Sequence, residues 1–153
     1  MSVSDTRTAS DDLSGGALVE LIGSVGGDVV DKLIVSDDLE DLRQTLYSIT
    51  ERDEVNLIVT TGGTGFGPRD NTPEATRSVI EREAPGLAEA MRSETLKNTP
   101  FAMLSRGVCG IRGNTLIINL PGSPKGVAEC FEVIRPVLQH AVNLIGGETA
   151  HSK

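Results

Sequence analysis

Aromatic and basic side chains are scarce in this chain of 153 residues. It has no tryptophan, one tyrosine and three phenylalanines, and its 22 acidic residues outnumber its 14 lysines and arginines, which gives a net charge of −8. Nucleic acids and anionic membranes demand basic surfaces, and single-stranded nucleic acids also stack on aromatic rings. We therefore expect no nucleic acid and no membrane among the main partners.

Cysteine, histidine and long apolar runs are scarce as well. Cys109 and Cys130 lie far apart and outside any Cys-x-x-Cys pattern, which indicates small buried side chains in a reducing compartment, the cytoplasm. His140 and His151 come late in the chain and have no acid–base context, so histidine catalysis finds no support. No run approaches the ~20 apolar residues of a transmembrane helix, and the polar, acidic N-terminus predicts no signal peptide.

Strand-like and helix-like segments alternate along the chain, and its length suits one domain. The expected strands are residues 29–35, 55–61, 108–111 and 115–120, and the expected helices are residues 14–25, 39–49, 73–82, 86–96 and 124–145. This alternation predicts an α/β fold of three layers, with a mostly parallel sheet flanked by helices on both faces. The domain should span residues 1–147, and residues 148–153 should form a frayed C-terminal tail.

Several helix boundaries have their own signals. Asp37 followed by Glu40 resembles a capping box, with Asp37 as the N-cap. Thr72 and Ser123, each followed by proline, are the predicted N-caps of two later helices. Pro136 lies inside the last predicted helix and should kink it.

The stretch from Val55 to Glu74 runs from a buried strand through a glycine-rich loop into a helix, and four glycines fall within six positions, from Gly62 to Gly67. A P-loop is excluded because Pro68 stands where its lysine should be, and the spacing Gly-x-Gly-x-x-Gly is not met either. Glycines let backbone N–H groups approach an anion, here at the strand end where open α/β sheets bind ligands. A plain tight turn is the alternative, but it rarely needs four glycines, so we favour a ligand loop.

Residues 60–76 read TTGGTGFGPRDNTPEAT and resemble the signature of the molybdopterin-binding family. The resemblance continues through residues 79–86, 103–106 and 110–123, and so covers nearly the whole chain. That family includes bacterial molybdopterin adenylyltransferase and the G domain of gephyrin with its plant counterpart, and the chain resembles the gephyrin type most.

The resemblance implies an enzyme that adenylylates molybdopterin with ATP and Mg²⁺ and releases pyrophosphate, a step of molybdenum cofactor synthesis. It also implies a homotrimer. The second, metal-inserting domain of gephyrin has no counterpart here, so either a separate molybdenum-inserting protein takes that step or the chain is one domain of a larger protein. Two alternatives stay open: a non-catalytic scaffold that acts by trimerising, and a pterin- or nucleotide-binding homologue without turnover.

Carried over residue by residue, the resemblance also predicts the site. Asp37 and Asp70 are the predicted catalytic residues and the predicted Mg²⁺ ligands, since a hard cation prefers carboxylates. The predicted residues for binding substrate and nucleotide are Ser4, Asp5, Ser14, Gly15, Thr61, Gly62, Gly63, Thr64, Gly65, Ser105, Arg106, Asn119, Pro121, Gly122, Ser123 and Lys125.

Some of these positions also have a purely structural explanation. Asp37 would serve as a helix cap, and Asp70 would serve in the turn before a helix. Ser105 and Arg106, which we place on the pterin side, would cap an apolar turn, and Lys125 would be an ordinary solvated lysine.

Three departures from the family pattern stand out. An apolar first strand should precede the segment matched by residues 4–6, yet only Met1 to Val3 precede it, so either the chain begins late or that strand is truncated. Leu13 replaces an arginine, and Asp38 replaces a glutamate. The first departure should weaken the sheet, and the second removes a charge from the predicted site.

Overall fold

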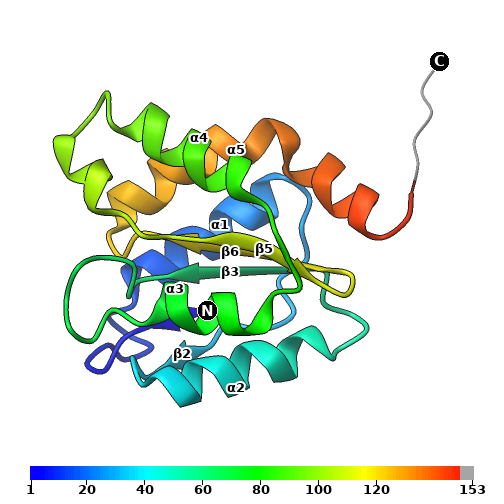
Figure 1. The fold of residues 1–153 in the computed structure, drawn as a ribbon, viewed down its shortest axis with the longest axis horizontal. Helices are drawn as coiled ribbons and strands as arrows, with labels where there is room; N and C mark the ends of the chain where they lie inside the picture. Colours follow the sequence, from blue (N-terminus) through cyan, green and yellow to red (C-terminus); the bar gives the residue numbers. More distant parts are fainter. Residues whose placement is uncertain (149–153) are drawn as a thin grey trace.

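Within residues 1–148, which the computed structural model of the protein describes, six strands form one sheet in the order β2-β1-β3-β6-β5-β4 (Figure 1). Their bounds are Ser2–Val3 for β1, Ile34–Val35 for β2, Leu57–Thr61 for β3, Arg82–Glu83 for β4, Cys109–Arg112 for β5 and Thr115–Leu120 for β6. The pairs β2–β1, β1–β3 and β3–β6 are parallel, whereas β6–β5 and β5–β4 are antiparallel. In this sheet β5 therefore runs against the other strands, and the predicted mostly parallel sheet is confirmed.

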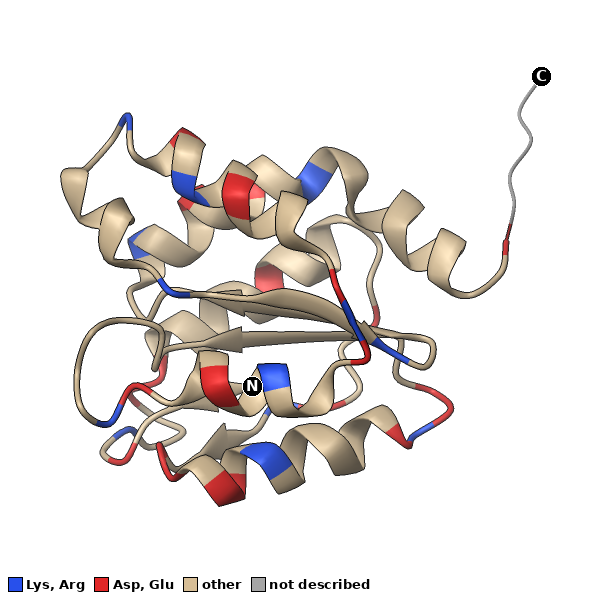
Figure 2. Cartoon of the chain, in the orientation of Figure 1, with Lys and Arg blue, Asp and Glu red and all other residues tan. Residues whose placement is uncertain are grey.

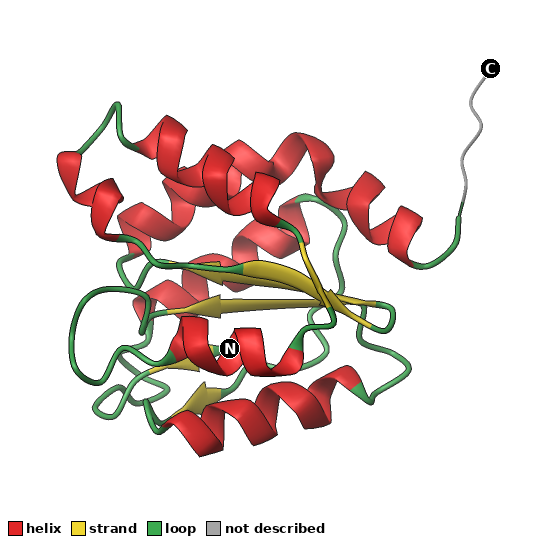
Figure 3. Ribbon diagram, in the orientation of Figure 1, coloured by secondary structure: helices red, strands yellow, loops and turns green. Residues whose placement is uncertain are grey.

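Helices cover both faces of this sheet, as Figure 3 shows. Their bounds are Leu13–Ser24 for α1, Leu39–Thr50 for α2, Thr72–Val79 for α3, Pro85–Thr95 for α4 and Pro124–Ile145 for α5, and a 3₁₀ helix, η1, spans Pro100–Leu104. α1, α4 and α5 pack in one core against one face, and α2 and α3 pack in a second core against the other. The predicted three layers are thus confirmed. Across residues 1–148, no helix has both the length and the hydropathy to cross a bilayer.

The strands β3 and β6 form the middle of the sheet and are paired over five residues, from Leu57 with Leu116 to Thr61 with Leu120. Neither strand carries a charged residue, and the charges lie mainly on helices and loops (Figure 2). Alternate side chains of β6 enter opposite cores, so that strand is buried along its whole length. Helices cover both faces of the sheet at these strands, and this explains why their sequences are nearly continuous apolar runs.

Two predicted helix caps are wrong by one residue. The N-cap of α2 is Asp38, whose carboxylate accepts hydrogen bonds from the N–H groups of Glu40 and Asp41. Asp37 is turned away from the helix because its carboxylate accepts the N–H of Asp5 instead. The N-cap of α3 is Asn71, and the Thr72 hydroxyl donates to the Gly62 carbonyl at 2.9 Å. The predicted cap at Ser123 is confirmed.

Two predicted element boundaries are also wrong. The strand expected at 29–35 is reduced to Ile34–Val35, because the short β1 offers only Ser2 and Val3 as pairing partners. The helix expected at 73–82 ends at Val79, and Arg82 instead forms β4 together with Glu83, and this strand pairs with β5. Helix α5 continues through Pro136. The predicted tail at 148–153 lies outside the described residues except for position 148.

Gly62, which directly follows β3, tests how tightly the central strands are packed. Its φ is +101°, and a Cβ atom there would lie 2.6 Å from the Val3 carbonyl oxygen. We expect Gly62→Ala to lower the free energy of unfolding by at least about 1 kcal/mol, measured by urea denaturation.

The matched control is Gly16→Ala in α1, where an added Cβ meets no atom within 4 Å. Alanine is the better helix former, so this variant should gain about 0.5–1 kcal/mol. Equal stability of the two variants would show that β1 and the start of the glycine loop are packed more loosely than described.

Candidate functional site

The carboxyl ends of β1, β2, β3 and β6 lie at one edge of the sheet because these strands are parallel. Hydrogen bonds join the loops that follow them. The Thr61 hydroxyl at the end of β3 donates to the Pro121 carbonyl after β6 at 2.7 Å. The Gly122 carbonyl accepts from Arg7 Nη2 at 2.7 Å and from Ser14 Oγ at 2.6 Å. This edge is where open α/β sheets bind ligands.

Arg106 fixes the glycine loop after β3 through several hydrogen bonds. Its Nε donates to the Gly65 carbonyl and its Nη2 to the Asp70 carbonyl, each at 2.7 Å. Nη1 pairs with the Glu74 carboxylate of α3, and the backbone N–H of Arg106 donates to the Thr64 carbonyl at 2.8 Å. Carbonyls at both ends of the loop are therefore drawn toward one guanidinium, which fixes the loop's course without a ligand.

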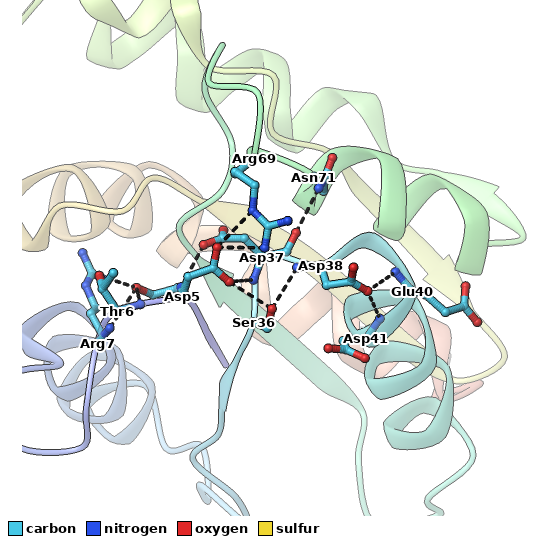
Figure 4. A network of polar contacts seen from close by, with 11 residues as sticks. Asp5, Thr6, Arg7, Ser36, Asp37, Asp38, Glu40, Asp41, Arg69 and Asn71 are labelled. Atoms are coloured by element: carbon cyan, nitrogen blue, oxygen red, sulfur yellow. Dashed lines mark hydrogen bonds and ion pairs between the residues drawn. The ribbon is translucent and has the colours of Figure 1, made fainter.

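A second network joins the loops after β1, β2 and β3, and Figure 4 shows it from close by. Asp5 Oδ2 accepts from Arg69 Nε and Nη2 at 3.0 and 2.8 Å, and Asp5 Oδ1 accepts from Ser36 Oγ and the Asp37 N–H, both at 3.0 Å. The Asp37 carboxylate accepts the Asp5 N–H at 2.9 Å, and the Asp37 carbonyl accepts Asn71 Nδ2 at 2.9 Å. Three loops far apart in sequence are thereby tied around Asp37.

The two acids at the centre of this network have opposite electrostatic environments. Hydrogen bonds from Arg69 lower the pKa of Asp5. Burial raises the pKa of Asp37, and the charges of Asp5 and Asp70 raise it further. The carboxylate of Asp37 thus lies among other acids, and a bound cation would relieve this repulsion.

The carboxylates of Asp37 and Asp70 both face the glycine loop. A Cβ atom at Gly63 would lie 3.4 Å from Asp37 Oδ1, and Cβ atoms at Gly65 and Gly67 would lie 2.9 and 3.0 Å from Asp70 Oδ2. Asp70 Oδ2 also accepts the Gly67 N–H at 2.9 Å. No group of three or more His, Cys, Asp or Glu side chains within residues 1–148 is arranged to hold a metal ion. Mg²⁺ is often held by one or two carboxylates together with substrate phosphates, a mode that needs no larger cluster of protein ligands.

A cavity of about 530 Å³ opens beside the glycine loop. It is lined by the glycine loop, by Asp70, and by residues of α4, η1 and the first two turns of α5. Phe101 and Leu104 make part of the wall apolar, while Arg92 and Glu129 bring charge into it. A second cavity, of about 140 Å³, lies at the other end of β3 and contains no predicted site residue.

Residues 1–140 match the family model described as "Probable molybdopterin binding domain". The chain belongs to this family. It is 48% identical, over 98% of its length, to the molybdenum cofactor synthesis protein cinnamon of Drosophila melanogaster, and it spans 26% of that protein. It is 40% identical, over 96% of its length, to the molybdopterin adenylyltransferase of Helicobacter pylori strain J99, and it spans 86% of that protein.

A solved structure agrees with this assignment to the molybdopterin-binding family. The molybdopterin biosynthesis enzyme MoaB of Thermus thermophilus superimposes on the chain with a TM-score of 0.87 at 46% identity, covering 95% of this chain and 93% of that one. The family resemblance drawn from the glycine-loop signature is therefore confirmed.

The structure divides the predicted binding residues into groups. Those that line the cavity are Gly63, Thr64, Gly65, Ser105, Pro121, Gly122 and Ser123, together with Asp70. Ser4, Asp5 and Asp37 do not line the cavity and belong to the network of Figure 4 or lie next to it.

The remaining predicted residues do not line the cavity. Asn119 is buried in the core, where its Nδ2 donates to the hydroxyls of Thr60 and Thr76. Ser14 and Thr61 donate to carbonyls of the loop after β6, and the Gly62 carbonyl accepts from the Thr72 hydroxyl. The Gly15 N–H donates to the Asp12 cap of α1, and Arg106 is hydrogen-bonded to the glycine loop. The Lys125 side chain is 82% exposed.

Arg7, Arg92, Phe101 and Glu129 belong to the site region and were not predicted from the sequence. Glu129 could have been predicted from the sequence, because it lies three residues after Gly126 in α5 and the two residues therefore share one face of that helix. Arg92 had none, since only the packing of α4 against α5 brings it to the cavity.

Arg106→Lys tests the role of the arginine behind the loop, since one ammonium group cannot replace the planar fork that reaches Gly65, Asp70 and Glu74. We expect the free energy of unfolding to fall by about 1–3 kcal/mol and hydrogen exchange at residues 63–71 to accelerate. Arg43→Lys is the control, because Arg43 pairs with the exposed Glu40 on the surface of α2, and it should change stability by less than about 0.5 kcal/mol. Unchanged exchange in the Arg106 variant would contradict this role.

Proposed function

We propose that the protein transfers the adenylyl group of ATP to the terminal phosphate of molybdopterin and releases pyrophosphate, a step of molybdenum cofactor synthesis. The observation that carries this proposal is that the carboxylates of Asp37 and Asp70 both lie against a glycine loop that also lines a cavity. Relatives named molybdopterin adenylyltransferase support it.

In this reaction a phosphate oxygen of molybdopterin attacks the α-phosphorus of ATP, and the bond from that phosphorus to the bridging oxygen of pyrophosphate breaks. Both reactants are anions, so the site must offset their repulsion and hold them in line. Asp37 and Asp70 are the residues that would hold Mg²⁺. The bound ion would supply positive charge that orients the triphosphate and eases the departure of pyrophosphate.

The backbone supplies the other contacts that anions need. Gly62 and Gly63 have positive φ, at +101° and +66°, which turns the chain sharply at the end of β3. The Gly62 N–H donates to the Leu120 carbonyl, so the N–H groups from Gly63 onward are the ones that would form a cradle for a phosphate. Ser123 caps α5, and the first turn of that helix lines the cavity, so a second phosphate would meet the positive end of the helix dipole.

The proposal extends to the assembly and its setting. We assign the protein to the cytoplasm as a homotrimer that passes its product to a separate molybdenum-inserting protein. The free cysteines Cys109 and Cys130 support a reducing compartment, since burial raises the pKa of these thiols to about 12 and about 11 and makes them inert.

The test is pyrophosphate release from ATP and Mg²⁺, with and without molybdopterin. We expect release that depends on molybdopterin, and we expect Asp37→Asn and Asp70→Asn each to reduce kcat/KM at least about a hundredfold, since each removes one charge from the proposed cation site.

Asp38→Asn is the matched control, because Asp38 neighbours Asp37 in sequence but caps α2, and asparagine caps a helix equally well. It should keep wild-type turnover and stability. Wild-type turnover in the Asp70 variant would falsify the metal-site assignment, and an absence of release in every protein would favour the non-catalytic alternatives.

A further inference from the structure

Glu129 in the wall of the cavity has an unusual environment for a carboxylate. Its side chain is only 25% exposed, and its one ion pair within residues 1–148 is with Lys125 Nζ, at 3.9 Å. That lysine is 82% exposed, so it is a weak partner. No hydrogen bond to the Glu129 carboxylate occurs in the same part of the chain. Neither Glu129 oxygen is among the buried polar atoms without a partner in residues 1–148, so water solvates the carboxylate until a ligand supplies donors in its place.

The rest of the wall shows what kind of ligand would do so. Arg92 also lines the cavity, and its Nη1 is fixed by the Gly107 carbonyl at 2.9 Å. Phe101, Ala102 and Leu104 of η1 contribute apolar surface. The cavity therefore combines an apolar wall with a carboxylate that accepts and a guanidinium that donates, which is suited to a flat heteroaromatic ring with polar edges.

We propose that Glu129 recognises the pyrimidine edge of the pterin, so that this residue sets the selectivity of the site for a 2-amino-4-oxo ring; this inference rests on the proposed function. A pterin presents its N3–H and its 2-amino group side by side, and the two oxygens of a carboxylate accept both. Adenine presents an amino donor next to the acceptor N1, so a carboxylate opposes one of its two positions. Arg92 is the group in the same wall that can donate to the 4-oxo oxygen.

The position of Glu129 along α5 agrees with this assignment. Ser123 and Glu129 are six residues apart, which is about 9 Å along a helix. Both residues line the cavity. A ligand with a pterin ring at one end and a phosphate at the other would place its phosphate at the helix start and its ring near Glu129. The nucleotide would then occupy the side of the glycine loop where Asp5 and Asp37 lie.

The experiment compares two small probes, 6-hydroxymethylpterin and 6-hydroxymethyllumazine, in which an oxo group replaces the 2-amino group. Binding to the full chain is followed by quenching of the probes' fluorescence. The wild-type protein should bind the pterin at least about tenfold more tightly than the lumazine, because the Glu129 carboxylate repels a 2-oxo group.

Glu129→Gln should reverse this preference. The glutamine amide still accepts from N3–H, but its NH₂ group now donates to the 2-oxo oxygen of the lumazine and faces the 2-amino group of the pterin. We expect pterin affinity to fall at least about tenfold and lumazine affinity to rise. Glu132→Gln, on the same helix but paired with Arg135 on the surface, is the matched control and should keep the wild-type ratio.

A thermal melt of each variant separates loss of selectivity from loss of folding. An unchanged pterin-to-lumazine ratio in a folded Glu129→Gln variant would overturn the inference, as would wild-type protein that fails to distinguish the probes. Pyrophosphate release with molybdopterin judges the proposed function separately. Release without a change in selectivity would overturn only the inference, and selectivity without release would overturn only the adenylyl transfer.

Discussion

The parallel pairing of β3 with β6 is the constraint on which the rest of the structure depends. Five residue pairs in register, from Leu57 with Leu116 to Thr61 with Leu120, bring the ends of two buried strands to the same edge of the sheet. The loop after β3 and the loop after β6 therefore lie next to each other, and the Gly62 N–H donates to the Leu120 carbonyl at 3.2 Å. A slip of one residue would exchange the two cores, because alternate side chains of β6 enter opposite cores. The relative position of the loops that form the site is therefore fixed by the most buried strands of the chain.

The glycine loop is ordered by groups that do not face the cavity. The Arg106 guanidinium donates hydrogen bonds to the carbonyls of Gly65 and Asp70, and the Thr72 hydroxyl donates to the Gly62 carbonyl at the start of the loop. The loop's shape is thus set before any ligand arrives, which lowers the entropy lost on binding. Such preorganisation is what a reaction driven by positioning and electrostatics requires.

The sequence predicted the fold, the glycine loop and the cap at Ser123, because these depend on local chemistry and on the period of apolar residues. It did not distinguish Asp37 from Asp38, since either aspartate satisfies a capping pattern and only the contact with Asp5 turns the first one toward the loop. It did not reveal the contacts of the Arg106 guanidinium, whose partners lie 32 to 41 residues away along the chain. Local pattern names the residue types of a site, whereas tertiary packing decides which atom each side chain faces.

An acidic protein that binds two anions needs positive charge at its site to offset their repulsion. Most of the arginines around this site already have partners within the protein. Arg69 is paired with Asp5, Arg106 with Glu74, and Arg7 donates to the Gly122 carbonyl. Lys125 is exposed to solvent beside Glu129. Arg92 lies in the cavity wall, where we propose that it meets the pterin ring. The phosphates are then left with backbone N–H groups, which carry no net charge to neutralise them. Burial raises the pKa of Asp37, and the charges of Asp5 and Asp70 raise it further, so additional negative charge at this site is unfavourable. Electroneutrality therefore argues that a cation enters with the nucleotide, and that its affinity depends on phosphate oxygens as much as on the two carboxylates.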